Sequence, residues 1–435
     1  MRERYIYKGL KKDGLINALL NLSRSIEYIS LLISNCDGNK KKLPMDYIHY
    51  DFIAGIGAID LLITNKNSFN QLKRFHSKKK DWLFGCLSYD LKNENEKLSS
   101  KNIDNFNASN LSFFVPEYVI LFRDNIMEIQ TYHCREKSDR FVNAFDFSKL
   151  PAYQNEISLI RREDKKSYLK KIEEIQRHIQ KGDVYEINYC QEFYASAVKF
   201  LSESVFYELN KRMQTPFSAF LKLHEKYILS VSPERFLKKK SNYILSQPIK
   251  GTRKRGEKRR EDVILKNELK NSAKDIAENI MITDLVRNDL SITAKKESVK
   301  VEELCEVYTF NKVHQMITSV VAEIDETVNF VDVLKSNFPM GSMTGAPKLR
   351  AMELIESFEE FKRGFFSGAV GYITPQADFD FNVVIRTILY NLANNYLSIS
   401  VGGAITINSE SIEEYDECLI KSKPLFDVLN FKLDD

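Results

Sequence analysis

The sequence predicts a large α+β (mixed α/β) protein whose strands are mostly antiparallel. Short runs rich in β-branched and aromatic residues alternate with amphipathic segments of helical period through most of the chain. The 435 residues, 43% of them hydrophobic and 29% charged, are enough for one large or two medium-sized domains with buried cores. This composition excludes a disordered, collagen-like or disulfide-stapled chain.

Hydrophobic period and turn residues predict the individual elements. Residues 111–122 have a strand pattern, and the Asn-, Lys- and Ser-rich stretch 92–110 before them is predicted to be a loop. The pattern loosens around 151–164, so we expect an N-terminal region at 1–155 and a second domain at 156–435. A helix begins at Lys165 and ends before Gly182. Further strands are expected at 217–223, 227–232, 243–249, 368–373, 380–389 and 396–407, and further helices at 260–290, 347–362 and 409–429.

Cysteine usage, charge and hydropathy exclude several classes of protein. The six cysteines stand far apart and form no CxxC pair, so neither a zinc cage nor a disulfide framework is expected. The net charge of +4 is too small to indicate a polyanionic partner. No apolar run approaches the ~20 residues of a membrane span, and the polar N-terminus does not resemble a signal peptide. We therefore expect a cytoplasmic protein that neither enters a membrane nor is exported.

A lysine and a glutamate are expected to face one site at the end of a hairpin. Two β-rich runs flank the polar turn at 240–242, and a hairpin closed there places Glu234 roughly opposite Ile249 and near Lys250. The neighbours of Lys250 are apolar or small, and desolvation would lower its pKa and expose its lone pair as a nucleophile. From the spacing alone, a surface lysine at a strand end is the more common arrangement.

Carboxylates on two predicted helices are candidate metal ligands. Glu278 shares the apolar face of its helix with Met281, Ile282 and Leu285, where a metal ion or a salt bridge, for example to Arg287, explains it equally well. The C-terminal helix carries three acids and a base on one face: Glu410, Glu414, Glu417 and Lys421. A solvated face is the commoner explanation of such a stripe. Carboxylates from different helices, without His or Cys, suit Mg²⁺ better than zinc.

Three further features indicate an anionic ligand. The loop at 339–346 leads into a helix whose Pro347 suits the first turn, which leaves backbone N–H groups free to hold an anion, although the spacing is not that of a P-loop. Gly402 and Gly403 interrupt a strand pattern, which indicates a bulge or a close approach to a ligand. Arg386 lies in an apolar strand and requires a carboxylate from protein or ligand. Local structure explains each feature singly, and an anionic ligand explains all three.

These residues lie in strings that resemble the chorismate-utilising enzymes, most closely the synthase components of aminodeoxychorismate synthases. The strings run from about residue 165 to about 425: GDVYEINYCQEF, ILSVSPERF, QPIKGTRKRG, NSAKDIAENIMITDLVRNDL, ESVKVEEL, KVHQMITSVV, FPMGSMTGAPKLRAMELIE, GAVGYI, VVIRT and EEYDECLIK. The first 150 residues match only loosely, through DWLFGCLSYDL. The resemblance implies a two-lobed sandwich of mostly antiparallel sheets with helices on the outside.

The resemblance also implies a reaction. Anthranilate synthases have alanine in PIAGT where this chain has Lys250 in PIKGT. In synthases of the PIKGT type, the lysine attacks C2 of chorismate as the 4-hydroxyl leaves, and ammonia then enters at C4 and expels the lysine. Glu234 of SPERF would be the general acid, in agreement with the hairpin argument. The implied product is 4-amino-4-deoxychorismate, for p-aminobenzoate and folate synthesis.

Binding residues are implied in the same way. Glu278 and Glu417, with Glu414 directly or through water, would hold Mg²⁺, which binds the ring carboxylate of chorismate. The other implied residues hold the substrate carboxylates or line the pocket: Arg386, Lys421, Gly402, Gly403, Ala404, Ser342, Thr344 and His314.

Glu186 departs from the family pattern. Water-using relatives carry lysine at this position and nitrogen-using relatives commonly carry glutamine, so we expect Glu186 to accept a proton from ammonia or to hydrogen-bond to it. No cysteine has the setting of a class I glutaminase, which requires a Cys–His–Glu domain of its own. The ammonia is therefore expected to come from a separate glutaminase subunit.

Two other functions fit part of the sequence. Anthranilate synthase component I would share every feature except Lys250, and it would also eliminate pyruvate. A nucleic-acid-binding protein would use the basic residues at 238–240 and 253–260. Acidic residues interleaved among them, and the lack of a recognisable binding module, favour solvated loops and no nucleic-acid partner.

Overall fold

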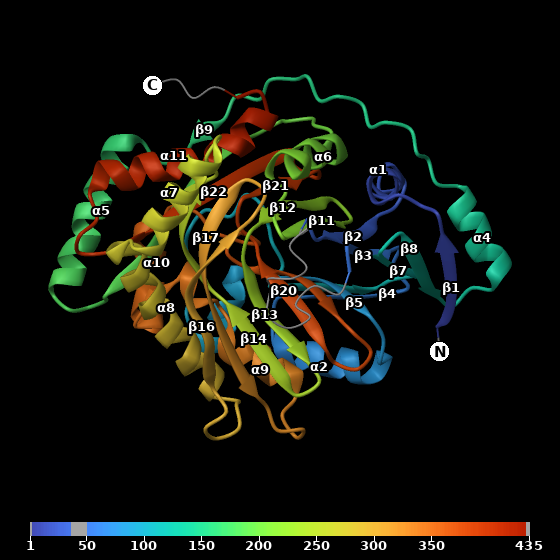
Figure 1. The fold of residues 1–435 in the computed structure, drawn as a ribbon, viewed down its shortest axis with the longest axis horizontal. Helices are drawn as coiled ribbons and strands as arrows, with labels where there is room; N and C mark the ends of the chain where they lie inside the picture. Colours follow the sequence, from blue (N-terminus) through green and yellow to red (C-terminus); the bar gives the residue numbers. More distant parts are fainter. Residues whose placement is uncertain (1, 36–49, 432–435) are drawn as a thin grey trace.

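Two large antiparallel sheets form the body of the protein. The computed structural model describes residues 2–35 and 50–431 (Figure 1). Within these residues the first sheet has 12 strands. Eleven follow one another in the order β1 (Glu3–Lys8), β8 (Ile126–Thr131), β7 (Tyr118–Arg123), β3 (Phe52–Ile56), β2 (Tyr28–Ile33), β11 (Phe217–Leu223), β12 (Lys226–Ser232), β21 (Thr387–Asn391), β22 (Tyr396–Ile405), β10 (Glu186–Ala195) and β18 (Gly345–Ala346), and β9 (Ile160–Arg161) pairs with β10.

The second sheet has 10 strands among the described residues. Nine follow one another in the order β15 (Ile249–Lys254), β17 (Val313–Glu323), β14 (Tyr243–Gln247), β13 (Arg235–Lys240), β20 (Phe379–Val383), β19 (Ala369–Ile373), β5 (Leu83–Leu87), β6 (Leu111–Val115) and β4 (Asp60–Thr64), and β16 (Lys300–Thr309) pairs with β17. Neighbouring strands pair antiparallel in both sheets, as the sequence predicts.

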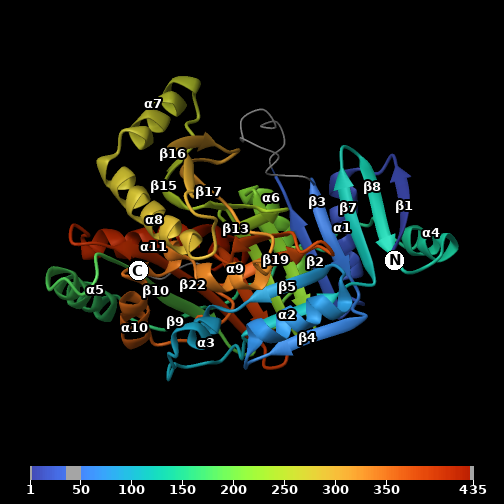
Figure 2. The same ribbon diagram turned by 90° about the horizontal axis from the view of Figure 1, so that it is seen from below.

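Helices surround the sheets. They are α1 (Lys12–Leu22), α2 (Ser68–Lys79), α3 (Lys92–Glu96), α4 (Arg135–Asn143), α5 (Lys165–Gln180), α6 (Ser202–Met213), α7 (Arg259–Lys270), α8 (Ala273–Ser291), α9 (Phe330–Asn337), α10 (Lys348–Phe358) and α11 (Ser411–Val428), with short 3₁₀ turns η1 (Tyr89–Leu91) and η2 (Gly341–Met343). Helices α5, α7, α8, α10 and α11 gather on one side of the molecule, and α1 and α4 lie on the opposite side (Figures 1 and 2). The predicted α+β class is confirmed.

The strand alternation explains how two cores form. On β3 the side chain of Ile53 belongs to the core that lies between the sheets, whereas Phe52 and Ala54 belong to the core between the first sheet and its helices. Successive side chains of a strand point to opposite faces, so a strand that is buried on both faces contributes to both cores. The first sheet is therefore the central layer of the structure.

Both sheets contain strands from before and after residue 155. In the first sheet β2 pairs with β11, and in the second β5 pairs with β19. The residues of the predicted N-terminal region thus share hydrogen-bonded sheets with the residues of the predicted second domain.

Three predicted elements are each divided in the structure. The helix expected at 260–290 is two helices, because the side chain of Ser272 accepts a hydrogen bond from the Asp275 N–H and caps the start of α8. The strand expected at 111–122 breaks between β6 and β7 at Pro116, which has no N–H to donate. The strand expected at 380–389 is β20 and β21, which belong to different sheets.

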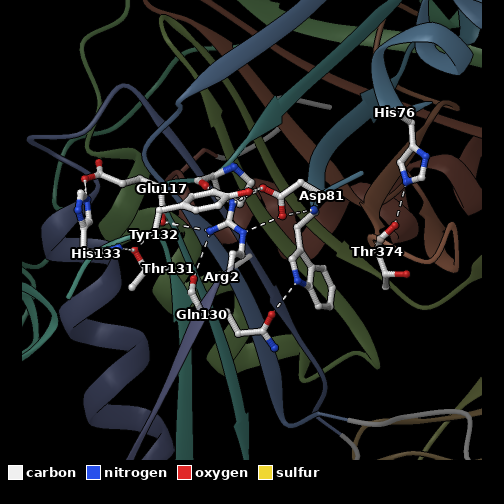
Figure 3. A network of polar contacts seen from close by, with 11 residues as sticks. Arg2, His76, Asp81, Glu117, Gln130, Thr131, Tyr132, His133 and Thr374 are labelled. Atoms are coloured by element: carbon white, nitrogen blue, oxygen red, sulfur yellow. Dashed lines mark hydrogen bonds and ion pairs between the residues drawn. The ribbon is translucent and has the colours of Figure 1, made fainter. Parts of the chain in front are cut away.

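A polar network holds the N-terminus against the first sheet (Figure 3). Arg2 donates from Nε and Nη2 to the two carboxylate oxygens of Asp81, at 2.7 and 2.9 Å. The adjacent Trp82 donates from its indole N–H to Gln130 on β8, at 2.9 Å. His133 contacts Glu117 nearby. These contacts join the start of the chain to β8 and to the segment that leads into β5.

A buried ion pair supports the loop that precedes α10. The guanidinium of Arg363 contacts the carboxylate of Glu359, at 2.6 Å, and both side chains are buried. Arg363 also donates to the carbonyl oxygens of Met343 and Asn188, at 2.6 and 2.8 Å. These bonds fix the loop against β10, beside the start of that strand.

No helix within the described ranges combines the length and the apolar character that crossing a membrane requires.

Candidate active site

Lys250 and Glu186 form an ion pair between the two sheets. Lys250 lies on β15 of the second sheet, and Glu186 is the first residue of β10 in the first sheet. The Lys250 Nζ lies 2.8 Å from the Glu186 Oε1, and the two side chains are 10% and 1% exposed. The alternative of a surface lysine is therefore wrong. Two residues 64 positions apart meet because each comes from a different sheet.

The ammonium form of Lys250 is stabilised, contrary to the prediction of a lowered pKa. Burial by itself lowers the pKa of Lys250. The carboxylates of Glu186, Glu278 and Glu234 outweigh burial, so that the pKa is raised. The local sequence around Lys250 shows its apolar neighbours, but these acids come from other elements. Lys250 is consequently a charged amine that must lose a proton before it can act as a nucleophile.

Glu234 lies at the base of the predicted hairpin, and this hairpin is confirmed. Lys240 pairs with Tyr243 across the turn, and a bulge then brings Arg235 opposite Gln247. Glu234 is buried, and its Oε1 accepts a hydrogen bond from the Ser342 hydroxyl at 2.7 Å. Burial raises the pKa of Glu234 to about 7, although Ser342, Lys250 and the Ile249 N–H each favour the ionised form. Glu234 can therefore carry a proton near neutral pH.

Glu278 faces the same ion pair from α8. It has no contact with Arg287, which instead pairs with Asp284 at 2.8 Å. Burial raises the pKa of Glu278 to about 7, the charge of Lys250 lowers it, and the charge of Glu186 raises it again. The apolar-face position predicted from the sequence thus brings this carboxylate toward Lys250.

Helix α11 presents two acids and a lysine to β22. Glu414 is buried and accepts a hydrogen bond from Ser409 at 2.8 Å. Glu417 pairs with Lys421 at 2.5 Å, and Lys421 donates to the carbonyl of Gly402 at 2.8 Å. The stripe is therefore not simply a solvated face. Glu410 stands apart as the residue before the first turn of α11.

Gly402 and Gly403 lie in a regular strand, so the bulge considered for them is absent. β10 and β22 pair without a shift from Ile187 opposite Ile405 onward, with Ala404 opposite Asn188. The close approach is real: a Cβ on Gly403 would lie 3.0 Å from the Glu414 Oε2. A Cβ on Gly402 would lie 2.4 Å from the Cys190 Sγ. Glycine at 403 therefore lets α11 bring Glu414 against the strand, whereas glycine at 402 makes room for Cys190 of β10.

The carboxylates suit Mg²⁺ in their chemistry but do not form a compact cage. Oxygen ligands alone are what Mg²⁺ prefers, and Glu414 and Glu417 converge over Gly403. Lys274 of α8 contacts Glu414 at 3.7 Å, and the charges of Glu278 and Glu417 also raise the pKa of this lysine. Within residues 2–35 and 50–431, no three His, Cys, Asp or Glu side chains lie close enough together to hold one ion.

Lys274 is a residue of this site that was not predicted from the sequence. It stands four residues before Glu278 on α8, so both side chains lie on one face of the helix. That spacing was a signal that could have identified it as the amine that neutralises the acids of α8 and α11.

Arg386 lies at the junction of the two sheets and not within a strand. The chain leaves β20 and enters β21 across residues 384–386, and Arg386 has a φ of +52°. Its Nη1 donates to the Lys421 carbonyl oxygen at 3.1 Å, and burial lowers its pKa. Among the described residues it forms no ion pair with a carboxylate. Its guanidinium is therefore available to an anion.

The loop at 340–346 contributes two hydroxyl groups. Ser342 binds Glu234, whereas Thr344 is fully buried and donates to the carbonyls of Met340 and Gly341, both at 3.2 Å. Pro347 is the residue before the first turn of α10 and not part of that turn, because its ψ of 139° is extended.

His314 is not joined to the other predicted site residues by a hydrogen bond or ion pair. Its Nε2 contacts Asp262 at 2.9 Å and its Nδ1 contacts Thr309 at 3.0 Å. Both ring nitrogens thus have protein partners, and the ring is buried. These contacts give His314 a structural role and do not support its expected place in the lining of the substrate pocket.

Several side chains of the basic runs considered for nucleic acid have acidic partners. Arg253 contacts Asp275 at 2.9 Å, and Arg255 contacts Asp262 at 2.7 Å. Lys239 lies 3.3 Å from Asp378. Neutralisation within the protein leaves these side chains less able to contact phosphates.

Replacing Gly403 with alanine is expected to weaken ligand binding without unfolding the protein. The added Cβ would displace the Glu414 carboxylate by a few tenths of an ångström. For the chorismate and Mg²⁺ that the resemblance implies, we expect the concentrations that give half-maximal activity to rise roughly tenfold. Steady-state titrations measure this effect, and thermal unfolding serves as the control. A variant with unchanged titrations would show that the strand at Gly403 is remote from the ligands.

Several known proteins are similar to this chain in sequence or in fold. Aminodeoxychorismate synthase component 1 of Escherichia coli (strain K12) is 37% identical over 66% of this chain and 61% of its own length. Anthranilate synthase component 1 of Saccharolobus solfataricus is 31% identical over 80% of each chain. The crystal structure of anthranilate synthase component I from Streptococcus pneumoniae TIGR4 matches the fold with a TM-score of 0.77, at 22% identity, over 88% of this chain and 94% of that chain.

These likenesses confirm the fold predicted from the resemblance. The chain spans less than two thirds of the length of the Escherichia coli relative. The sequence pattern of the family described as chorismate binding enzyme matches residues 56–427, most of the chain. This chain therefore belongs to the chorismate binding enzyme family.

Proposed function

We propose that this protein converts chorismate and ammonia to 4-amino-4-deoxychorismate. The observation that carries the proposal is the buried Lys250, held between the sheets and faced by Glu186, Glu234 and Glu278. A lysine at this place is a nucleophile that a chain with alanine there would lack. The relative from Escherichia coli, named aminodeoxychorismate synthase component 1, supports the same activity.

The reaction would proceed in two displacements. The Lys250 amine attacks C2 of the ring, the two ring double bonds shift, and the C4–O bond breaks. Glu234 gives its proton to the departing hydroxyl, which leaves as water. Ammonia then adds at C4, the double bonds shift back, and the C2–N bond to Lys250 breaks. The excess proton on the new amine returns to Glu234, so the protein ends the cycle unchanged.

Binding would use the cations and acids around this centre. Glu278, Glu414 and Glu417 would hold Mg²⁺, which supplies a positive charge for the ring carboxylate. Lys274 and Lys421 hold these acids in the structure and would have to release them. Arg386, with no carboxylate partner among the described residues, would bind a substrate carboxylate.

A separate subunit would supply the ammonia. The Escherichia coli relative is called component 1, a name that implies a second component. We propose that this component is a glutaminase, because the reaction consumes ammonia and the five described cysteines lie among strands and helices of the fold without a glutaminase setting.

The experiment is a product analysis. Purified protein is incubated with chorismate, Mg²⁺ and ammonium, and the products are separated by chromatography. We expect aminodeoxychorismate and no anthranilate, because no lyase is added. Fluorescent anthranilate would instead assign the activity of the Saccharolobus solfataricus relative. A parallel reaction with a chelator in place of Mg²⁺ is expected to lose most of its activity.

A further inference from the structure

Glu186 differs from the other acids around Lys250 in its contacts. Its Oε1 is the one carboxylate oxygen in hydrogen-bond contact with the Lys250 amine among the described residues, at 2.8 Å. Its Oε2 is also buried and accepts no hydrogen bond within those residues. Glu234 is engaged by Ser342, while Glu278 and Glu417 act on Lys250 through their charge, without a hydrogen bond or ion pair to it.

The backbone holds Glu186 in place. It begins β10 and pairs with Ala346 of β18, and the next residue, Ile187, pairs with Ile405 of β22. A strand paired on both sides cannot easily shift its first side chain, so the distance to Lys250 is set by the two sheets.

We propose that Glu186 is the proton acceptor that turns Lys250 into a nucleophile and later returns the proton to it. This role rests on the proposed function. It differs from the contact with ammonia that the sequence suggests, because Glu186 would act before ammonia enters the site.

The proton balance follows from the contacts. In the resting protein Lys250 is an ammonium and Glu186 a carboxylate. As C2 of the ring approaches, the ammonium gives one proton to the Glu186 Oε1, and the freed lone pair forms the C–N bond. When ammonia has added at C4 and the C2–N bond breaks, Lys250 leaves as a neutral amine and recovers its proton from Glu186. The proton of Lys250 therefore needs no donor or acceptor other than Glu186.

The buried Oε2 explains why Glu186 accepts the proton. A buried carboxylate is stable only when hydrogen bonds or a cation compensate for its lost hydration. Glu186 has no hydrogen bond to its second oxygen, so Lys250 is its main compensation. Transfer of the Lys250 proton to Glu186 leaves an uncharged amine and an uncharged acid, so that no unpaired charge is created in the buried space between the sheets.

The test is Glu186→Gln, which keeps the shape and removes the acceptor. Adduct formation is followed without ammonia by rapid quench and intact-mass measurement, and ammonium-dependent kcat is followed in parallel, both from pH 5.5 to 7. The wild-type rates are expected to be nearly constant at saturating Mg²⁺, which keeps Glu278 ionised, because the transferred proton stays within the pair. The variant is expected to be roughly a hundredfold slower at pH 6 and to gain about tenfold per pH unit, because its lysine must lose its proton to solvent.

The other acids facing Lys250 remain in this variant: Glu234 before β13, Glu278 on α8 and Glu417 on α11. A change in the rates and in their pH dependence that is seen only in Glu186→Gln is therefore assigned to the missing proton acceptor. Glu173→Gln on the exposed face of α5 is the matched control, and its rates should follow the wild type. Glu186→Asp retains a carboxylate and is expected to keep the wild-type pH dependence at a lower rate. This variant tests the proposal even where the glutamine variant folds poorly.

Two results would overturn the proposal. Glu186→Gln with the pH dependence and rates of the wild type would show that another group takes the proton. Unchanged adduct formation with a raised KM for ammonium would assign Glu186 to ammonia instead. Failure of the proposed function would look different, since the wild-type protein would then make anthranilate or form no product.

Discussion

Lys250→Ala is expected to lower the rate of aminodeoxychorismate formation by roughly 10⁴-fold or more, because it removes the group that forms the covalent bond. Lys274 and Lys421 do not lie where Lys250 does: Lys274 is on α8 against Glu414, and Lys421 is on α11 against Glu417 and the Gly402 carbonyl. The measurement is kcat at saturating chorismate, Mg²⁺ and ammonium, with the product quantified by chromatography. Intact-mass analysis without ammonia should show chorismate less one water bound to the wild-type protein and nothing bound to the variant.

Lys240→Ala is the matched control. Lys240 is exposed at the turn of the same hairpin, so its loss removes one charge without touching the residues around Lys250, and activity should be unchanged. A Lys250→Ala variant that retained a tenth or more of the wild-type kcat would exclude the covalent route. The absence of an adduct alone would not exclude the covalent route, since a short-lived adduct escapes detection. The kinetic comparison of the variants therefore decides whether the route is covalent.

The elements whose structure depends on residues close by in the chain were predicted correctly from the local sequence. The turn at 240–242 closes the hairpin, α5 begins at Lys165, and the strand at 217–223 is found with these bounds. Period and turn residues suffice where the chain folds back on itself. The approach of Glu234 to Lys250 was predictable for the same reason, since both lie at the base of one hairpin.

What the sequence could not provide was the assignment of strands to sheets. Residues 380–389 have one continuous strand pattern, yet the chain changes sheets at Arg386, whose positive φ turns it. The charge state of Lys250 was missed for a related reason. Glu186 and Glu278 reach it from another sheet and from a helix, and no local pattern records their charges.

Glu234→Gln is expected to lower kcat/KM roughly 10²–10⁴-fold, the usual range for loss of a general acid. The acid must be protonated to release the 4-hydroxyl. Since the pKa of Glu234 is raised to about 7, the proton is held below this pH and lost above it. The wild-type kcat/KM should therefore fall about tenfold per pH unit above pH 7, and the variant should lack this fall. The measurement is kcat/KM for chorismate between pH 5.5 and 9.

Ser342→Ala separates Glu234 from the other acid with a similar pKa. The Ser342 hydroxyl stabilises the ionised form of Glu234, so its removal should raise the pKa and move the falling limb to higher pH. Glu278, whose pKa is also about 7, would act with the opposite sign: it must be ionised to bind a cation, so its titration makes activity rise with pH. A falling limb that persisted in Glu234→Gln, or stayed in place in Ser342→Ala, would therefore show that Glu234 is not the acid, because neither change affects a proton held elsewhere.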